Sequence, residues 1–78
     1  MSSEKEALLD EFRKPGTRTY ADAANLLRAF GFEERLTARG HSIWSSRGMS
    51  ITLPTSGHLK YPYKKLIERA VLNVALLE

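Results

Sequence analysis

The chain has 78 residues, of which 42% are hydrophobic and 27% are charged, and it contains no cysteine. This composition predicts a single domain over residues 1–78 with one small core, because a disordered chain has fewer hydrophobic residues. The lack of cysteine excludes disulfide bonds and thiolate-ligated zinc. No hydrophobic stretch approaches the roughly 20 residues that span a bilayer, and charges interrupt the N-terminal segment, so we expect no membrane association, no signal peptide and a cytoplasmic location.

Charge is distributed unevenly along the chain. Residues 1–36 contain six Lys or Arg and seven Asp or Glu, whereas residues 37–78 contain six and two, so the two halves contribute −1 and +4 to the net charge of +3. Both histidines lie in the basic half. This distribution favours an anionic partner such as nucleic acid, and the alternative is a basic surface that is simply hydrated.

Two helices are predicted in the N-terminal part of the chain. Residues 3–14 have a hydrophobic stripe and stop at a Pro-Gly-Thr linker, so we expect a short helix appended to a core over residues 19–77. Residues 19–30 also have hydrophobic residues at helical spacing. Thr19 is expected to cap this second helix, and Gly31 is expected to close it in a left-handed conformation.

A strand is predicted next, over residues 32–38. Phe32, Leu36 and Ala38 alternate with polar residues and are therefore expected on one face, with Glu34 as the exception to the pattern.

Two further strands are predicted over residues 41–46 and 49–53. The first follows a turn at Arg39-Gly40, and a second turn at Arg47-Gly48 separates the two strands. Connections this short join neighbouring strands in opposite directions, so we expect a three-stranded antiparallel sheet.

The last part of the chain is predicted to be a loop over residues 54–61 followed by a helix that begins at Pro62. Leu72 and Leu76 fall outside the main hydrophobic stripe, so they are expected to pack on the N-terminal helix or to form an interface. The stripe itself comprises Tyr63, Leu66, Ile67, Ala70, Val74 and Leu77.

This order of elements predicts an α+β fold. Its core is α-β-β-β-α, with two helices on one face of a three-stranded antiparallel sheet, and the N-terminal helix is extra. The layout is that of the double-stranded-RNA-binding-domain fold, although a fold alone does not define a function.

Three segments of this core resemble the HicA family of bacterial toxins. They read LLRAFGFEERLTARGHSIW, ITLP and HLKYPYKKLIERA, and they occur in the family's order and spacing within residues 19–72. The resemblance implies the toxin component of a type II toxin–antitoxin system, an endoribonuclease that cleaves mRNA without the ribosome. It also implies a HicB-type antitoxin that inhibits the enzyme, so the chain is expected as a monomer or in a complex with that protein.

The resemblance assigns the family's one catalytic histidine to His41. This residue opens the second predicted strand and is followed by the aliphatic-aromatic pair Ile43-Trp44. The family's Gly-Ser-His segment reads Arg39-Gly40-His41 here, and Ser42 stands where a second histidine is common.

The chemistry of RNA cleavage agrees with this assignment. An imidazole gains and loses a proton near neutral pH, so His41 is a candidate general base or general acid. Gly40 allows close approach of an RNA backbone. Basic residues of the two turns and of the last helix's start are candidate phosphate contacts, namely Arg39, Arg47, Lys60, Lys64 and Lys65. The alternative for Lys64, Lys65 and Arg69 is the hydrated face of an amphipathic helix.

Other polar and aromatic residues have competing interpretations. His41 is alternatively a strand-edge histidine bonded to backbone, and His58 is expected as an exposed loop residue or, alternatively, as the acid–base partner of His41. Trp44 shares strand parity with Ser42 and not with His41, so we expect it in the core rather than stacked on a base. Two histidines with no evident carboxylate predict neither a metal site nor a cofactor.

Two alternative hypotheses remain for the function of the whole chain. One is a non-catalytic RNA-binding module on the same fold. The other is a protein-interaction module whose basic surface meets an acidic surface of the antitoxin, with RNA binding only incidental.

Overall fold

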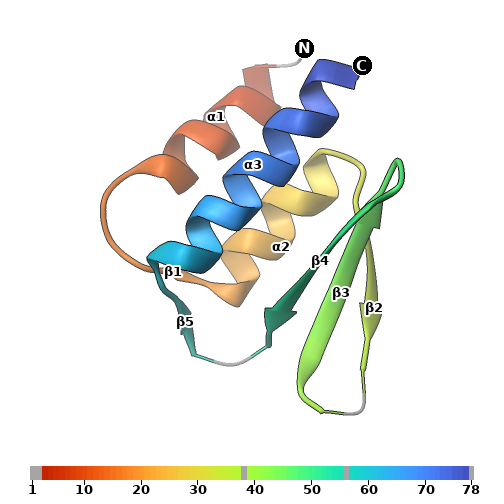
Figure 1. The fold of residues 1–78 in the computed structure, drawn as a ribbon. Helices are drawn as coiled ribbons and strands as arrows, with labels where there is room; N and C mark the ends of the chain where they lie inside the picture. The colour runs from red at the N-terminus through yellow and green to blue at the C-terminus, as the bar shows by residue number, and fades with distance from the viewer. Residues whose placement is uncertain (1–2, 38, 56, 78) are drawn as a thin grey trace.

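The computed structural model describes residues 3–37, 39–55 and 57–77, which form an α+β fold as predicted (Figure 1). In chain order the elements are α1 (Ser3–Arg13), β1 (Arg18–Thr19), α2 (Tyr20–Ala29), β2 (Glu33–Leu36), β3 (His41–Ser46), β4 (Met49–Pro54), β5 (His58–Leu59) and α3 (Tyr61–Leu77).

The main sheet is three-stranded and antiparallel in the order β2-β3-β4, which confirms the predicted meander. Its covered face carries two directly opposed pairs, Ser42 with Leu53 and Trp44 with Ile51, and all four residues are buried. The three helices lie to one side of this sheet (Figure 1). The opposite face of the sheet therefore stays open, and Trp44 belongs to the core as expected.

The local signals at the ends of the elements have the expected effects. Thr19 caps α2, and a capping box forms because its side chain accepts from the Asp22 backbone N–H while the Asp22 carboxylate accepts from the Thr19 N–H. Gly31 has a φ of 87° just after the helix. Arg47 and Gly48 have φ values of 50° and 83°, which is the type I′ geometry preferred by two-residue hairpins.

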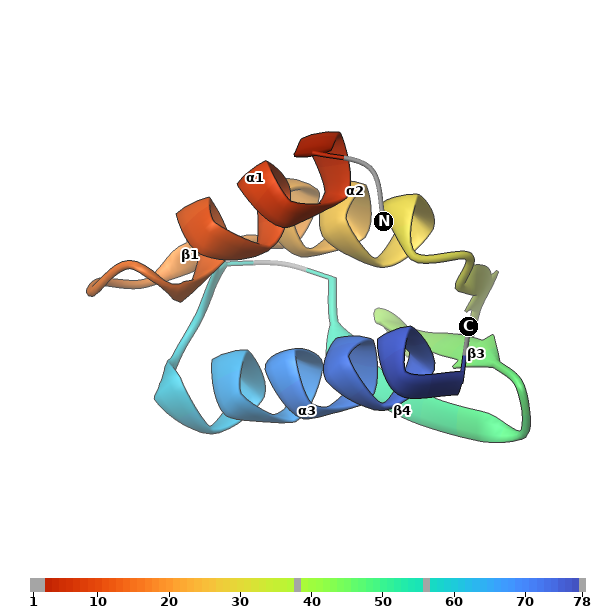
Figure 2. The same cartoon turned by 90° about the horizontal axis from the view of Figure 1, so that it is seen from above.

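The N-terminal helix α1 is part of the core. It packs on both α2 and α3, and its Leu9 and Phe12 are buried in the same hydrophobic cluster as Trp44. In Figure 2, α1 and α2 form one layer and α3 lies below them. The linker after α1 thus folds this helix back onto the domain and does not set it apart.

The buried face of α3 differs from the predicted stripe. Tyr63 and Leu66 were expected in the core but are 38% and 40% exposed, whereas Lys64 and Val71 are buried. The helix is rotated in this way because Lys64 lies over the end of α1, where its ammonium group finds backbone acceptors.

The first strand of the main sheet is shorter than predicted. β2 spans Glu33–Leu36, and Ala38 lies outside the described residues. Leu36 is 69% exposed because it ends an edge strand, beside which the described residues form no further strand. Glu34 is turned toward the helices, where it bonds to Tyr20 and Arg28. These two bonds explain why a charged residue stands at a position where the alternation predicts a hydrophobic one.

The segment predicted as a loop over residues 54–61 contains a strand. His58 and Leu59 form β5 and pair with Thr19 and Arg18 of β1, and Leu59 is buried. A two-residue strand is too short to show alternation, so the prediction of an uninterrupted loop was wrong for these residues.

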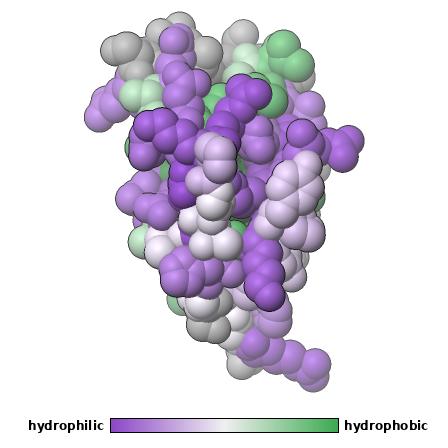
Figure 3. All heavy atoms as spheres, turned by 90° about the vertical axis from the view of Figure 1, so that its left-hand side faces the viewer, coloured by the Kyte–Doolittle hydropathy of each residue, from purple (hydrophilic) through white to green (hydrophobic). Residues whose placement is uncertain are grey.

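The surface around this small strand pair is mostly hydrophilic. Figure 3 shows that face, with hydrophobic side chains gathered toward the end where the two termini lie. Leu72 and Leu76 remain exposed on α3. Among the described residues, no helix has the length and apolar character that a membrane span requires.

Candidate functional site

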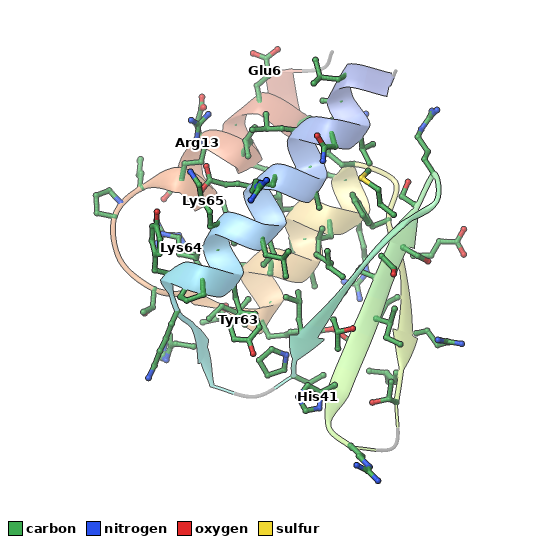
Figure 4. The ribbon with its side chains drawn as sticks, viewed as in Figure 1. Glu6, Arg13, His41, Tyr63, Lys64 and Lys65 are labelled. Atoms are coloured by element: carbon green, nitrogen blue, oxygen red, sulfur yellow. The ribbon has the colours of Figure 1, made fainter. Side chains whose placement is uncertain are left out.

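His41 lies at the start of β3 with an exposed side chain on the open face of the sheet (Figure 4). Hydrogen bonds from Thr37 hold its backbone in place. The His41 carbonyl oxygen accepts hydrogen bonds from the backbone N–H and the hydroxyl of Thr37, at 2.9 and 3.0 Å, and His41 stands opposite Pro54 of β4. The imidazole is therefore presented to solvent from a fixed backbone.

The hydrogen bonding of the ring determines which nitrogen is free. Nδ1 of His41 lies 3.1 Å from the carbonyl oxygen of Arg39. A carbonyl oxygen only accepts, so Nδ1 carries the hydrogen when the ring is neutral. Nε2 then holds the lone pair, and no described residue bonds to it. This exposed nitrogen is available as a proton acceptor.

Arg39 and Gly40 form the turn that leads into His41. Gly40 has a φ of 71°, and its carbonyl oxygen accepts from the Thr55 backbone N–H at 3.0 Å and from the Thr55 hydroxyl at 2.7 Å. The left-handed backbone is itself a sufficient reason for glycine at this position. Arg39 is exposed next to the imidazole in sequence, so the expected trio of Arg39, Gly40 and His41 is together.

Arg47 lies at the opposite end of β3 from His41. Six strand residues separate the two turns, which corresponds to about 20 Å at the usual rise per residue. The structure therefore does not bring Arg47 to the imidazole.

The lysines of α3 occupy three different environments. Lys60 is exposed and stands at the cap position, since its carbonyl oxygen accepts from the backbone N–H groups of Tyr63 and Lys64. Lys65 is exposed and lines a groove beside β4. In Figure 4, Lys64 and Lys65 lie beyond Tyr63 as seen from His41. Of the three lysines, only Lys60 lies in the segment that joins the His41 end of the sheet to α3.

Lys64 is corrected from a phosphate contact to a structural residue. It is 8% exposed, and its ammonium group donates to the carbonyl oxygens of Lys14 at 2.8 Å and Gly16 at 2.6 Å. Its nitrogen also lies 5.9 Å from the centre of the Phe12 ring. Because the Lys64 ammonium group is buried and bonded to these partners, it is not available to bind an RNA phosphate.

His58 is exposed, as expected, but it lies in β5. This strand pairs with β1 in a two-stranded sheet separate from the one that carries His41. The two histidines thus sit on different sheets.

A polar network on the covered face of the sheet was missed in the sequence. The Tyr20 hydroxyl donates to the Glu34 carboxylate, and it accepts from the Trp44 indole N–H at 3.1 Å. Ser42 is bonded to the same hydroxyl, and it accepts from the indole at 2.9 Å. Because Tyr20 gives its only proton to Glu34, Ser42 must donate to Tyr20.

The network continues to Arg28 on α2. Its guanidinium donates to Glu34 at 3.1 Å and lies 5.3 Å from the centre of the Trp44 ring. Burial raises the pKa of Tyr20, and its hydrogen bond to Glu34 raises it further. Ser42 therefore points away from the open face and helps to hold β3 on α2. The one sequence signal for this network was Glu34, a charged residue at a position where the strand alternation predicts a hydrophobic one.

Neither a metal-binding cluster nor a similar known protein adds information about the site. Within residues 3–37, 39–55 and 57–77, no three His, Cys, Asp or Glu side chains are grouped to hold a metal ion. Comparison of the chain with protein-family models, curated proteins and solved structures found no match. The geometry around His41 is consequently the basis on which a function can be assigned.

Proposed function

We propose that this protein is an endoribonuclease in which His41 acts as the general base. The observation that carries the proposal is the orientation of the exposed ring, with Nδ1 bonded to the Arg39 carbonyl and Nε2 open to solvent. An imidazole held in this way is ready to accept a proton from a substrate hydroxyl.

The reaction would proceed as a transfer within the RNA chain. Nε2 of His41 takes the proton of a ribose 2′-hydroxyl, whose oxygen attacks the adjacent phosphorus. The bond from phosphorus to the 5′-oxygen breaks, and that oxygen takes a proton from water, so the products are a 2′,3′-cyclic phosphate and a free 5′-hydroxyl. Arg39, which precedes the Gly40-His41 pair, and Lys60, which lies in the segment between β4 and α3, are the exposed cations proposed to bind the phosphates.

The fold supports the same proposal at a coarser level. Elements α2-β2-β3-β4-α3 have the order of a double-stranded-RNA-binding domain, with helices on one face of an antiparallel sheet. Together with the sequence resemblance to HicA toxins, this leads us to propose a cytoplasmic mRNA-cleaving toxin of a type II system. A HicB-type antitoxin would inhibit it by covering His41.

The test is cleavage of a long end-labelled RNA in the presence of EDTA. We expect the wild-type chain to cut, and the His41→Ala variant to be slower by about 100-fold or more, because loss of a general base typically has this effect. His58→Ala is the matched control, since it removes the other exposed histidine, and it should cut at the wild-type rate. Circular dichroism establishes that each variant is folded.

A non-catalytic RNA-binding module is the second candidate. It is favoured by the positions of Arg47 and Lys64, which leave few cations near the imidazole to stabilise a charged transition state. RNA binding by the wild type without cleavage would favour this module. Equal cleavage by His41→Ala and the wild type would remove His41 from the mechanism.

A further inference from the structure

The edge of β4 is unusually unprotected. This strand pairs with β3 on one side only, and residues 49–53 read MSITL, without a charge. Natural proteins usually protect edge strands with charges, bulges or proline, because free backbone groups recruit other strands. Here Pro54 ends the strand, so the part before it remains open.

The hairpin register shows which backbone groups face outward. The two-residue turn makes Ser46 and Met49 a hydrogen-bonded pair, and bonding then alternates along the strands. Ile51 consequently bonds inward to β3, while the N–H and C=O groups of Ser50 and Thr52 point to the free edge. No hydrogen bond to these groups is formed by any described residue.

A groove of about 440 Å³ runs between this edge and α3. Ile51 and Leu66 are apolar residues that line it, one from each wall, and Leu66 is exposed there. Lys65 and Arg69 line it from α3, and neither forms an ion pair with a described residue. Figure 2 shows β4 beside α3. The groove thus offers backbone bonding groups, an apolar wall and uncompensated positive charge.

We propose that this groove binds an extended acidic peptide segment of a partner protein, which adds to the sheet as a strand beside β4. The peptide backbone would bond to Ser50 and Thr52, alternate apolar side chains would contact Leu66, and carboxylates would meet Lys65 and Arg69. The surface does not include the His41 side chain, so the proposal is independent of RNA cleavage.

The same features disfavour two other occupants. A second copy of the chain paired edge to edge would bring Lys65 and Arg69 close to their own counterparts, and like charges repel. RNA phosphates accept hydrogen bonds but do not donate them, so they would leave the C=O groups of Ser50 and Thr52 without partners. A peptide supplies both donors and acceptors along one edge.

The experiment is an NMR titration of the ¹⁵N-labelled chain with a blocked heptapeptide in which valine and glutamate alternate. We expect the largest shifts at the amides of Ser50 and Thr52. Two matched peptides are controls, one with lysine in place of glutamate and one N-methylated on alternate residues. The lysine peptide should bind at least fivefold more weakly, and the N-methylated peptide, which cannot form the strand, at least tenfold more weakly.

Variants of the chain test the two walls separately. Thr52→Pro removes an outward N–H at an edge position that tolerates proline, and it should weaken binding at least tenfold, whereas Thr52→Ala should bind normally. Lys65→Glu should weaken binding severalfold, whereas Arg35→Glu, on the opposite edge strand, should not. Circular dichroism checks that all four are folded, and the N-methylated peptide tests the same contact without any mutation.

Several outcomes would overturn the proposal. These are an absence of shifts at β4 with millimolar peptide, equal binding of the lysine peptide, or equal binding of the N-methylated peptide. A dimer in sedimentation that Thr52→Pro dissociates would assign the edge to a second copy. Shifts of the Ser50 and Thr52 amides with an RNA oligonucleotide but not with the peptide would assign it to nucleic acid.

Discussion

The Tyr20 hydroxyl joins three elements of the fold through a single oxygen atom. It lies at the start of α2 and bonds to Glu34 of β2 and to both Ser42 and Trp44 of β3. Buried or partly buried polar groups are costly when a partner is removed, because the remaining groups have already lost their water. We therefore expect this one atom to contribute measurably to the stability of the domain.

The first prediction concerns that atom. Tyr20→Phe should lower the free energy of unfolding by about 1–2 kcal/mol, because Glu34 and the Trp44 indole each lose a partner. Urea denaturation followed by circular dichroism measures the change. Tyr63→Phe is the matched control, since the Tyr63 hydroxyl bonds to no described residue, and it should change stability little. Equal effects of the two substitutions would contradict the role given to the network.

A second prediction follows from the ionisation of the same hydroxyl. Burial raises the pKa of Tyr20 above its ordinary value of 10.0, so the folded chain keeps the proton at a pH where the unfolded chain loses it. The stabilisation is complete below about pH 10 and decreases as the pH rises through the folded-state pKa. Urea midpoints measured from about pH 8 to pH 11 should fall more steeply for the wild type than for Tyr20→Phe. Parallel pH curves would rule out this contribution.

At the level of elements, the end of α1 is held by two cations from elsewhere in the chain. The Arg18 guanidinium donates to the carbonyl oxygen of Glu11 at 2.8 Å, and Lys64 donates to that of Lys14 at 2.8 Å. The last carbonyl groups of a helix have no partner within it and carry its partial negative charge. Cations at this end therefore both satisfy the carbonyls and fix α1 against α3.

This arrangement predicts different roles for two adjacent lysines. Lys64→Met keeps the hydrophobic stem but removes the ammonium group, and it should cost about 1–3 kcal/mol of stability because charged hydrogen bonds are lost. Lys65→Met should leave the free energy of unfolding nearly unchanged, since Lys65 is exposed. Thermal and urea denaturation compare the two. A small effect of Lys64→Met would mean that water replaces the ammonium group at the helix end.

For the whole molecule, the main question is whether α1 and the sheet fold as one unit. Phe12 of α1 and Trp44 of β3 belong to the same buried cluster although they lie in different parts of the fold. Small domains with one core usually unfold in a single cooperative transition. A substitution in α1 should therefore lower the stability of the sheet as well.

This expectation can be measured with the sole tryptophan. Phe12→Ala should destabilise the chain by about 3–5 kcal/mol, because a large buried side chain is lost and a cavity remains. Trp44 fluorescence and circular dichroism should shift together to lower urea concentration, whereas Phe12→Leu should cause a smaller shift in both. An early loss of helix with an unchanged Trp44 transition would show instead that α1 is an appendage.

The three helices and the three strands of the main sheet were predictable from residues that are close in sequence. Thr19 meets Asp22 three positions on, and Arg47-Gly48 form a turn between adjacent strands. The alternation in residues 41–46 placed Trp44 in the core and His41 on the open face, so the location of the candidate site was also predictable. Such features depend on local backbone preferences and on side-chain periodicity, which a sequence displays directly.

The tertiary structure decided which polar side chains have hydrogen-bond partners within the fold and which are exposed to solvent. Lys64 reaches carbonyl groups 48 and 50 positions away, Glu34 reaches Tyr20 across 14 positions, and β5 pairs with a strand about 40 residues earlier. By sequence alone, Lys64 and Lys65 are equivalent basic residues on one helix. The packing of α1 against α3 buries one and leaves the other beside β4, because a side chain's partners are set by the elements that pack next to it.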